Sequence, residues 1–233
     1  MESAAPRQSP GQLLKGESMG QECTADQTVF IVDDDPAICE GLSDLLESTG
    51  KHTQHFFSAE EFIERWDAKQ PGCLVLDVRL PGITGMELQS KLGSSGVPIP
   101  IIIMTAHGDM PMVRKALKAG AVEFLIKPFT DQELLQAVEQ AFARDRANRQ
   151  AVRELSSIRA RINTLTDRER EVLTHVTAGL TNKEIAEKLF LSVVTIKLHR
   201  GQLMRKMGAE SLADLVKMWE RIHRQEQPAR PSA

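Results

Sequence analysis

The first half of the chain contains four short apolar segments that each end at a polar or charged residue, and this pattern constrains the fold most strongly. Two of them, 73–76 and 101–104, are continuous apolar runs, which are typical of strands buried inside a sheet, whereas 28–32 and 122–126 each include one polar residue, Thr28 and Glu123. The segments and the residues that follow them are 28–32 before Asp33-Asp34-Asp35, 73–76 before Asp77, 101–104 before Thr105, and 122–126 before Lys127. The pattern therefore predicts buried strands whose ends deliver carboxylates, a hydroxyl and an amine.

Helical patterns fill the gaps between these segments. Apolar residues at helical spacing, capping residues and terminal glycines predict helices at 37–49, 58–67, 85–92 and 110–119. A weaker, β-branched and aromatic segment at 53–57 indicates an edge strand. Strands that alternate with helices in this way form right-handed crossovers and a parallel sheet. We therefore predict an α/β domain with a doubly wound, five-stranded parallel sheet.

The polar residues at the strand ends are candidates for one site, because ligands bind at the carboxyl ends of the strands in open α/β sheets. Asp33, Asp34 and Asp77 supply the hard oxygen ligands that Mg²⁺ prefers. With the metal shielding charge, Asp77 could attack a phosphoryl group while Lys127 and Thr105 stabilise its oxygens. Each motif alone fits an ion-pair network at a sheet edge equally well. Together, each at a strand end, they favour a phosphoryl site.

The second half of the chain is predicted to be all-helical. No proline or glycine occurs from 130 to 178, so a helix that starts near Asp131 could continue to residue 163, either as a solvated linker or as a dimer-forming coiled coil. Four further helices are then predicted. Two begin at capping-box patterns, one begins at Ser192 or Val193, and one begins at Ser211. They cover 166–178, 181–189, 192–207 and 211–223. The tight connection at 190–192 between the second and third of these helices fits a helix-turn-helix.

Charge divides unevenly along the chain. Residues 28–130 contain 9 Lys and Arg against 14 Asp and Glu, whereas residues 164–225 contain 11 against 8. An acidic half followed by a mildly basic half suits a metal or phosphate site in the first and a nucleic-acid contact in the second. Three scattered cysteines, Cys23, Cys39 and Cys73, indicate reduced thiols in a cytosolic protein. We expect neither membrane association nor export, because long apolar runs and a signal pattern are absent from the sequence.

These patterns predict five segments along the chain. They are a disordered leader at 1–26, an α/β domain at 27–142, a helical linker at 143–163, a helix-turn-helix domain at 164–225 and a disordered tail at 226–233. The leader is rich in Ser, Gly, Gln and Pro and has little apolar content, so it cannot bury a core of its own.

Several motifs resemble two known families. The segments 31–34, 76–77 with 81–82, 105–109 and 127–129 resemble the flavodoxin-like receiver domain of two-component response regulators. The segments 165–173, 179–186 and 195–200 resemble the LuxR-type DNA-binding domain. This pair of domains is that of the NarL/FixJ family, and the segments 107–109 and 118–121 resemble the FixJ subgroup. The resemblance covers about residues 28–222.

The receiver resemblance implies roles for individual residues. Asp77 corresponds to the phosphoacceptor, Asp33 and Asp34 to the Mg²⁺ carboxylates, and Arg79 to the residue whose main-chain carbonyl completes the protein ligands. Lys127, before an expected cis Pro128, corresponds to the phosphoryl-binding lysine. The resemblance also implies that Thr105 and Phe124 form a switch pair, in which a phosphoryl charge draws in the hydroxyl and the ring turns inward.

The LuxR-type resemblance implies a DNA surface on the third of the four helices. The residues predicted to contact DNA are Asn182, Lys183, Thr195, Lys197, Leu198, Arg200 and Gly201. Lys197, Leu198 and Gly201 lie on the expected major-groove face, although Gly201 offers no side chain to a base.

The resemblance thus predicts a cytoplasmic transcriptional regulator rather than an enzyme. A sensor histidine kinase is the expected phosphodonor, Mg²⁺ the cofactor and promoter DNA the ligand. Homodimerisation on phosphorylation is expected, with RNA polymerase as a further candidate partner.

One competing interpretation is enzymatic. An apolar strand followed by Asp-x-Asp, here Asp33 to Asp35, is also typical of phosphohydrolases that form an aspartyl-phosphate. Asp33 would then be the nucleophile. The helix-turn-helix pattern has no explanation under this interpretation.

Overall fold

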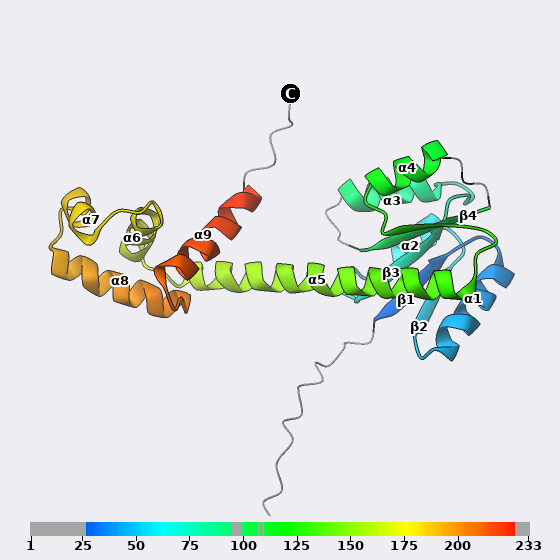
Figure 1. Cartoon of the computed structure of the whole chain (residues 1–233), viewed down its shortest axis with the longest axis horizontal. Coiled ribbons are helices and arrows are strands. Elements are labelled where there is room, and N and C mark those ends of the chain that lie inside the picture. Colours follow the sequence, from blue (N-terminus) through cyan, green and yellow to red (C-terminus); the bar gives the residue numbers. More distant parts are fainter. Residues whose placement is uncertain (1–26, 95–98, 107, 109, 227–233) are drawn as a thin grey trace, which may run out of the picture. The chain divides into compact units, whose positions relative to one another are not determined.

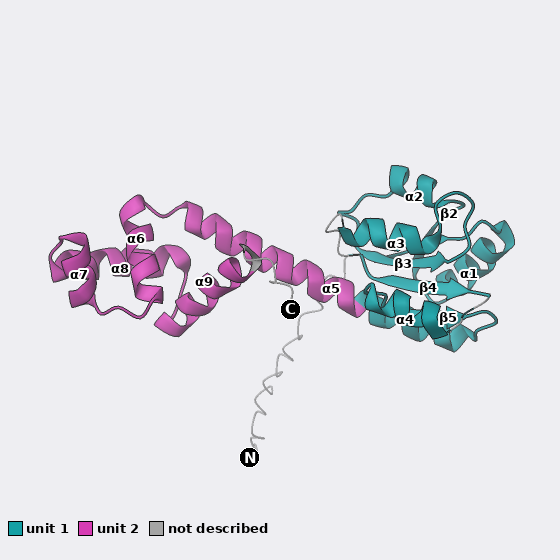
Figure 2. Ribbon diagram, turned by 90° about the horizontal axis from the view of Figure 1, so that it is seen from above, with its two compact units in different colours: residues 1–142 teal, residues 143–233 magenta. Residues whose placement is uncertain are grey.

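The computed structural model describes residues 27–94, 99–106, 108 and 110–226, and these form two compact units (Figures 1 and 2). Unit 1 comprises residues 1–142 and unit 2 residues 143–233. The predicted disordered leader, nearly all of the predicted tail and two residues of the 105–109 motif, His107 and Asp109, lie outside the described residues.

Unit 1 contains a five-stranded parallel sheet, and the predicted fold class is confirmed. The strand order is β2-β1-β3-β4-β5, so β2 and β5 form the edges. The strands are β1 (Thr28–Val32), β2 (His52–Phe56), β3 (Gly72–Asp77), β4 (Ile101–Thr105) and β5 (Glu123–Ile126). The helices between them are α1 (Pro36–Ser48), α2 (Ala59–Arg65), α3 (Gly85–Ser94) and α4 (Met110–Lys118).

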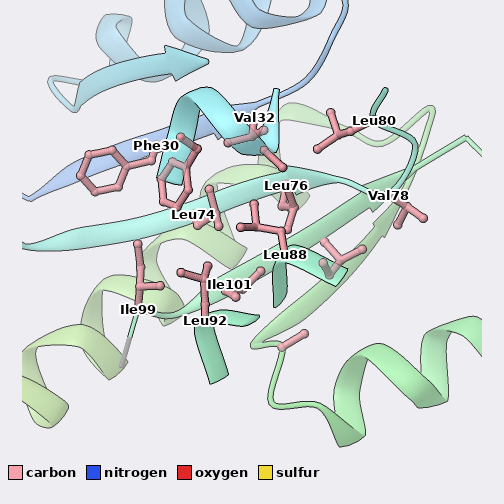
Figure 3. Close-up of a cluster of buried hydrophobic side chains, with 14 of the residues drawn as sticks. Phe30, Val32, Leu74, Leu76, Val78, Leu80, Leu88, Leu92, Ile99 and Ile101 are labelled. Carbon is pink, nitrogen blue, oxygen red and sulfur yellow. The ribbon is translucent and has the colours of Figure 1, made fainter. Parts of the chain in front are cut away.

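Helices cover both faces of this sheet because alternate residues of each central strand point to opposite sides. Phe30, Leu74 and Leu76 pack with Leu88 and Leu92 of α3 on one face, which α2 and α4 also cover (Figure 3). The residues between them on the strands pack against α1 and α5 (Asp131–Asn163) on the other face. Residues such as Val29, Ile31, Val75 and Ile102 form this second cluster. Burial on both faces explains why these strands are continuously apolar.

Some element boundaries differ from those predicted. Helix α2 ends at Arg65 rather than near Asp67, because the next residue, Trp66, turns into extended backbone and stacks its ring on Phe62 at a centroid distance of 5.1 Å. Strand β2 begins one residue earlier than expected, and Phe56 is its buried residue opposite Val32 of β1.

Helix α5 contains 33 residues without a break, as the absence of proline and glycine allows. Its first turns supply Leu134, Val138 and Ala141 to the core of unit 1. Its last turns supply apolar residues to unit 2, including the buried Ile158. Between these two stretches Asp145 is buried and accepts two hydrogen bonds from the Arg149 guanidinium, at 2.8 and 3.0 Å.

Unit 2 contains the four predicted helices around one apolar cluster. They are α6 (Asp167–Thr177), α7 (Asn182–Leu189), α8 (Val193–Met207) and α9 (Leu212–Glu226). Both predicted capping boxes are present, Thr166 with Glu169 and Thr181 with Glu184. Phe190 follows α7 in the left-handed conformation (φ 55°), and Ser192 then caps α8. This tight connection is the turn of the predicted helix-turn-helix.

The Glu169 carboxylate links two helices of unit 2. It is buried, accepts a hydrogen bond from the Thr166 main-chain N–H at 2.8 Å and pairs with Lys206 Nζ of α8 at 2.6 Å. Burial alone would raise the pKa of Glu169, but the hydrogen bonds from Lys206 and Thr166 outweigh it and lower that pKa below its ordinary value. The charged carboxylate therefore stabilises the folded unit.

We expect Glu169→Ala to lower the stability of unit 2 by about 1–2 kcal/mol at pH 7, the usual effect of losing a helix cap. Because the folded pKa is lowered, this contribution is present above the ordinary carboxyl pKa of about 4.3 and disappears as the pH falls through the folded value. Hydrogen exchange of the α6 amides at pH 7 and in acid measures it. Glu184→Ala, at the exposed capping box, is the control and should have a smaller effect; an equal effect would contradict the assignment.

Candidate functional site

The strand register gathers four polar residues at one edge of the sheet of unit 1. Val32 lies opposite Leu76, Asp77 opposite Met104, and Thr105 opposite Ile126. The residues that end these strands or follow them, Asp33, Asp77, Thr105 and Lys127, therefore lie at the carboxyl edge. Such an edge is the usual ligand-binding side of an open α/β sheet.

The Lys127 ammonium joins the two buried carboxylates of this edge. Its Nζ lies 2.7 Å from Asp33 Oδ2 and 2.9 Å from Asp77 Oδ1. The remaining oxygens accept main-chain hydrogen bonds, Asp77 Oδ2 from the Arg79 N–H at 2.5 Å and Asp33 Oδ1 from the Asp35 N–H at 3.0 Å. Each carboxylate oxygen thus has a donor, which is what buried charges require. The Lys127–Pro128 peptide bond is cis, as predicted.

The electrostatics of this cluster favour a charged lysine and a basic carboxylate. Burial raises the pKa of Asp77, and the hydrogen bonds from Lys127 and Arg79 and the Lys127 charge only partly offset this effect; the Asp33 charge adds a smaller increase. Burial alone would lower the pKa of Lys127, but its hydrogen bonds and charge interactions with both carboxylates raise it above the ordinary value. Lys127 therefore stays protonated, and Asp77 is an unusually basic carboxylate next to a fixed cation.

The other residues predicted for this site have different surroundings. Asp34 and Arg79 have exposed side chains beside the buried pair. Thr105 is almost completely buried, and its main-chain carbonyl accepts the Lys127 N–H at 2.8 Å. Phe124 is half-buried and packs against the apolar cluster that contains α3 and α4.

Two glycines near this site were assigned no function from the sequence, although Gly108 belongs to the 105–109 motif and Gly85 begins a predicted helix. A Cβ at Gly85, the first residue of α3, would lie 2.1 Å from the Asp77 carbonyl oxygen, so glycine lets α3 begin directly against β3. A Cβ at Gly108 would lie 2.9 Å from the Phe124 ring and 3.1 Å from Ile126. A glycine inside a motif was the available signal, but only the fold reveals what each one touches.

The carboxylates at this edge suit a magnesium site with few protein ligands. Among the described residues, no group of three or more His, Cys, Asp or Glu side chains is arranged to hold a metal. Mg²⁺ needs only one or two protein carboxylates, with water and phosphate oxygens completing its octahedron. The chemistry of Asp33 and Asp77, with the exposed Asp34 beside them, fits that requirement.

Unit 2 presents a second candidate site on α8. Ile196, Leu203 and Met207 face the core, whereas Lys197, Leu198 and Gly201 are exposed on the other side. Arg200 donates a hydrogen bond to Asn182 Oδ1 of α7 at 2.9 Å, so these two predicted contact residues lie together. Thr195 donates its main-chain N–H to Ser192 Oγ at 3.1 Å, and Lys183 is exposed at the start of α7.

Both units match family models. Residues 29–139 match the response regulator receiver domain, and residues 163–219 match bacterial regulatory proteins of the luxR family. Curated relatives share this arrangement over most of their length. Nodulation protein W of Bradyrhizobium diazoefficiens is 43% identical over 89% of this chain and 92% of its own. The transcriptional regulatory protein FixJ of Rhizobium meliloti is 43% identical over 83% of this chain and 95% of its own.

The chain belongs to the NarL/FixJ family of response regulators. Solved structures agree with this assignment. The response regulator StyR covers 84% of this response regulator at 46% identity, with a TM-score of 0.75. Full-length FixJ from B. japonicum covers 86% of it at 37% identity, with a TM-score of 0.51. No described helix of this response regulator is both long and apolar enough to cross a membrane.

We expect Lys127→Met to lower the stability of unit 1 by about 3–5 kcal/mol without Mg²⁺, because it leaves two buried carboxylates without their shared cation. Lys51→Met is the control: methionine keeps the largely buried stem of Lys51, whose side chain is 15% exposed, and removes its ion pair of 2.9 Å with Glu139, which is 60% exposed. An ion pair with such a solvated partner contributes about 0–1 kcal/mol. Hydrogen exchange of the β1 and β3 amides measures both. Equal losses in the two variants would contradict the central role of Lys127.

Proposed function

We propose that this response regulator receives a phosphoryl group on Asp77 from a sensor histidine kinase and, once phosphorylated, dimerises and binds promoter DNA. The observation that carries the proposal is the Lys127 ammonium bound to two buried carboxylates at the carboxyl edge of the sheet. Residues 27–142 act as the receiver, 143–163 as a helical linker and 164–225 as the DNA-binding domain.

The residues around Asp77 would have different roles in phosphoryl transfer. Asp33, Asp34, Asp77 and the Arg79 main-chain carbonyl would hold Mg²⁺, which supplies positive charge to shield the phosphoryl oxygens. An Asp77 oxygen forms a bond to phosphorus while the bond from phosphorus to the donor's histidine nitrogen breaks. Lys127, which is already hydrogen-bonded to Asp77, then binds a phosphoryl oxygen.

Thr105 and Phe124 would transmit the change to the surface. The new phosphoryl charge attracts the Thr105 hydroxyl, and the half-buried Phe124 ring turns into the space that this movement opens. Gly108 supports this role, because the absence of a side chain there lets its backbone lie close to that ring. Phenylalanine needs no hydrogen-bond partner in either position.

The dimer would form through the α4–β5 side of the receiver. Met110 and Leu117 of α4 and Ile126 of β5 are large, exposed apolar residues, and α4 contacts β5. Exposed apolar side chains grouped in this way are typical of protein–protein contacts. Dimerisation would also combine two weak DNA contacts into one stronger interaction on repeated half-sites.

DNA binding would use α8 as the recognition helix in the major groove. Lys197, Leu198 and Gly201 would face the bases, with Thr195 near the start of the same helix. Asn182, Lys183 and Arg200 would contact phosphates. Because the molecule acts on DNA, we place it in the cytoplasm, where RNA polymerase is a further candidate partner.

The competing interpretation as a phosphohydrolase has less support. Hydrogen bonding does not separate the two carboxylates, because both oxygens of Asp33 and both oxygens of Asp77 accept a hydrogen bond. The phosphohydrolase interpretation, however, leaves the helix-turn-helix without a role, so we propose a switch rather than a turnover enzyme.

The phosphoacceptor assignment predicts that Asp77→Asn abolishes incorporation of a labelled phosphoryl group from a small phosphodonor with Mg²⁺. Asp35→Asn is the control, because asparagine still caps α1 at that position, where the Asp35 side chain accepts the Ala37 N–H. It should retain labelling. Full labelling of Asp77→Asn would show that another residue is the acceptor.

The dimer proposal predicts that Leu117→Glu stays monomeric after phosphorylation, because a charge at this surface would be desolvated in the dimer. Ile63→Glu on α2 is a matched control, since Ile63 and Leu117 are 45% and 44% exposed. Sedimentation with and without a phosphodonor measures both variants. If phosphorylated Leu117→Glu dimerises like Ile63→Glu, the dimer interface does not include Leu117.

The DNA-binding proposal predicts that Lys197→Ala weakens promoter binding by about 1–3 kcal/mol, the usual value for a lost base contact. Lys217→Ala changes an exposed lysine of α9 and should leave affinity unchanged. Titration of labelled duplex DNA at fixed salt measures both. Unchanged binding by Lys197→Ala would exclude Lys197 as a base contact.

A further inference from the structure

The outermost stripe of α8 contains almost no hydrogen-bonding groups in its first half. With 3.6 residues per turn, residues seven and eleven positions apart return to nearly the same direction. Val194, Leu198, Gly201 and Arg205 follow this spacing and lie opposite the core residues of α8, which include Ile196 and Leu203. All four are exposed.

Two of these residues expose large apolar surfaces. The exposed fractions of Val194 and Leu198 are 77% and 60%. The third, Gly201, adds nothing, and a Cβ at that position would meet no atom within 4 Å. Gly201 therefore leaves unfilled a position from which a polar side chain could extend outward from the helix. The first two turns of the stripe can make apolar contacts but cannot donate or accept hydrogen bonds through their side chains.

Cationic side chains flank this stripe, in addition to the exposed apolar residues Phe190 in the preceding turn and Val193 at the start of α8. Lys197 and Arg205 are exposed on α8, and Lys183 is exposed on the preceding helix. A polyanion is therefore a better match for this surface than an apolar protein segment. The one apolar group that the major groove of DNA presents is the C5-methyl group of thymine.

We propose that Val194 and Leu198 read thymine C5-methyl groups, so that Val194 is a specificity-determining residue in addition to the predicted contact residues. This inference rests on the proposed DNA binding through α8. Val194 lies at the second position of the helix, and the N-terminal residues of a recognition helix are the ones that reach base edges. Sequence preference would then depend on apolar contacts more than on hydrogen bonds.

The test replaces thymine with deoxyuridine, which removes only the methyl group. A duplex is selected from a randomised library with the full-length, phosphorylated protein, and each thymine is then replaced singly. We expect affinity to fall about three- to fivefold at one or two positions in each half-site, the effect of losing one buried methyl group. Replacements elsewhere should have no effect.

The variant Val194→Ala assigns the contact to a residue. It should abolish the difference between thymine and deoxyuridine at one of these positions while the other, read by Leu198, keeps it. Val152→Ala is the matched control, because Val152 is 53% exposed on α5 and lies outside the recognition helix. It should behave like the unmodified protein.

Four results would overturn the inference. Equal affinity for every deoxyuridine duplex would exclude methyl recognition while leaving DNA binding intact. Persistence of all methyl effects in Val194→Ala would exclude Val194 as a reader. Absence of DNA binding under every condition would remove the proposed function and this inference with it. If Val194→Ala lowers transcription but changes neither affinity nor methyl effects, the stripe serves a protein partner instead.

Discussion

A single lysine ammonium between two buried carboxylates organises the receiver unit. Lys127 stands after the last strand, Asp33 after the first and Asp77 at the end of the third, so residues far apart in the chain meet at one edge. Removing the amine would leave both carboxylates without their shared cation, whereas removing either carboxylate would leave Lys127 paired with the other. The same contacts keep Lys127 protonated beside Asp77, whose pKa is raised chiefly by burial. Stability and the proposed chemistry therefore depend on one interaction.

The sequence predicted the sheet and most of the charged cluster because both follow from local patterns. Apolar runs indicated the strands, and parallel pairing of these strands predicted that Asp33, Asp77 and Lys127 lie at one edge. Sequence could not predict what depends on packing between distant segments. Trp66 ends α2 early because its ring stacks on Phe62. The constraint at Gly85 exists only because the start of α3 lies against the Asp77 carbonyl.

In the helix-turn-helix unit too, features that depend on neighbouring residues were predictable, whereas contacts between distant residues were not. Its capping boxes, Thr166 with Glu169 and Thr181 with Glu184, were predictable from four-residue patterns. The ion pair between Glu169 and Lys206 was not, because it joins α6 to α8 across the core. Exposure along α8 was predictable, because helical spacing puts Ile196 and Leu198 on different faces of the helix. The structure buries Ile196 in the core and exposes Leu198 on the outer stripe. The proposed contact with DNA depends on that difference.

In the proposed function, phosphorylation at Asp77 controls the affinity of α8 for DNA. The most direct test titrates one promoter duplex with the full-length protein, with and without a phosphodonor and Mg²⁺, in parallel with Asp77→Asn. We expect phosphorylation to raise the affinity of the unmodified protein at least about tenfold, equivalent to a coupling free energy of about 1.4 kcal/mol, and to leave Asp77→Asn unchanged. An unmodified protein that is phosphorylated but binds DNA with unchanged affinity would contradict the proposed function.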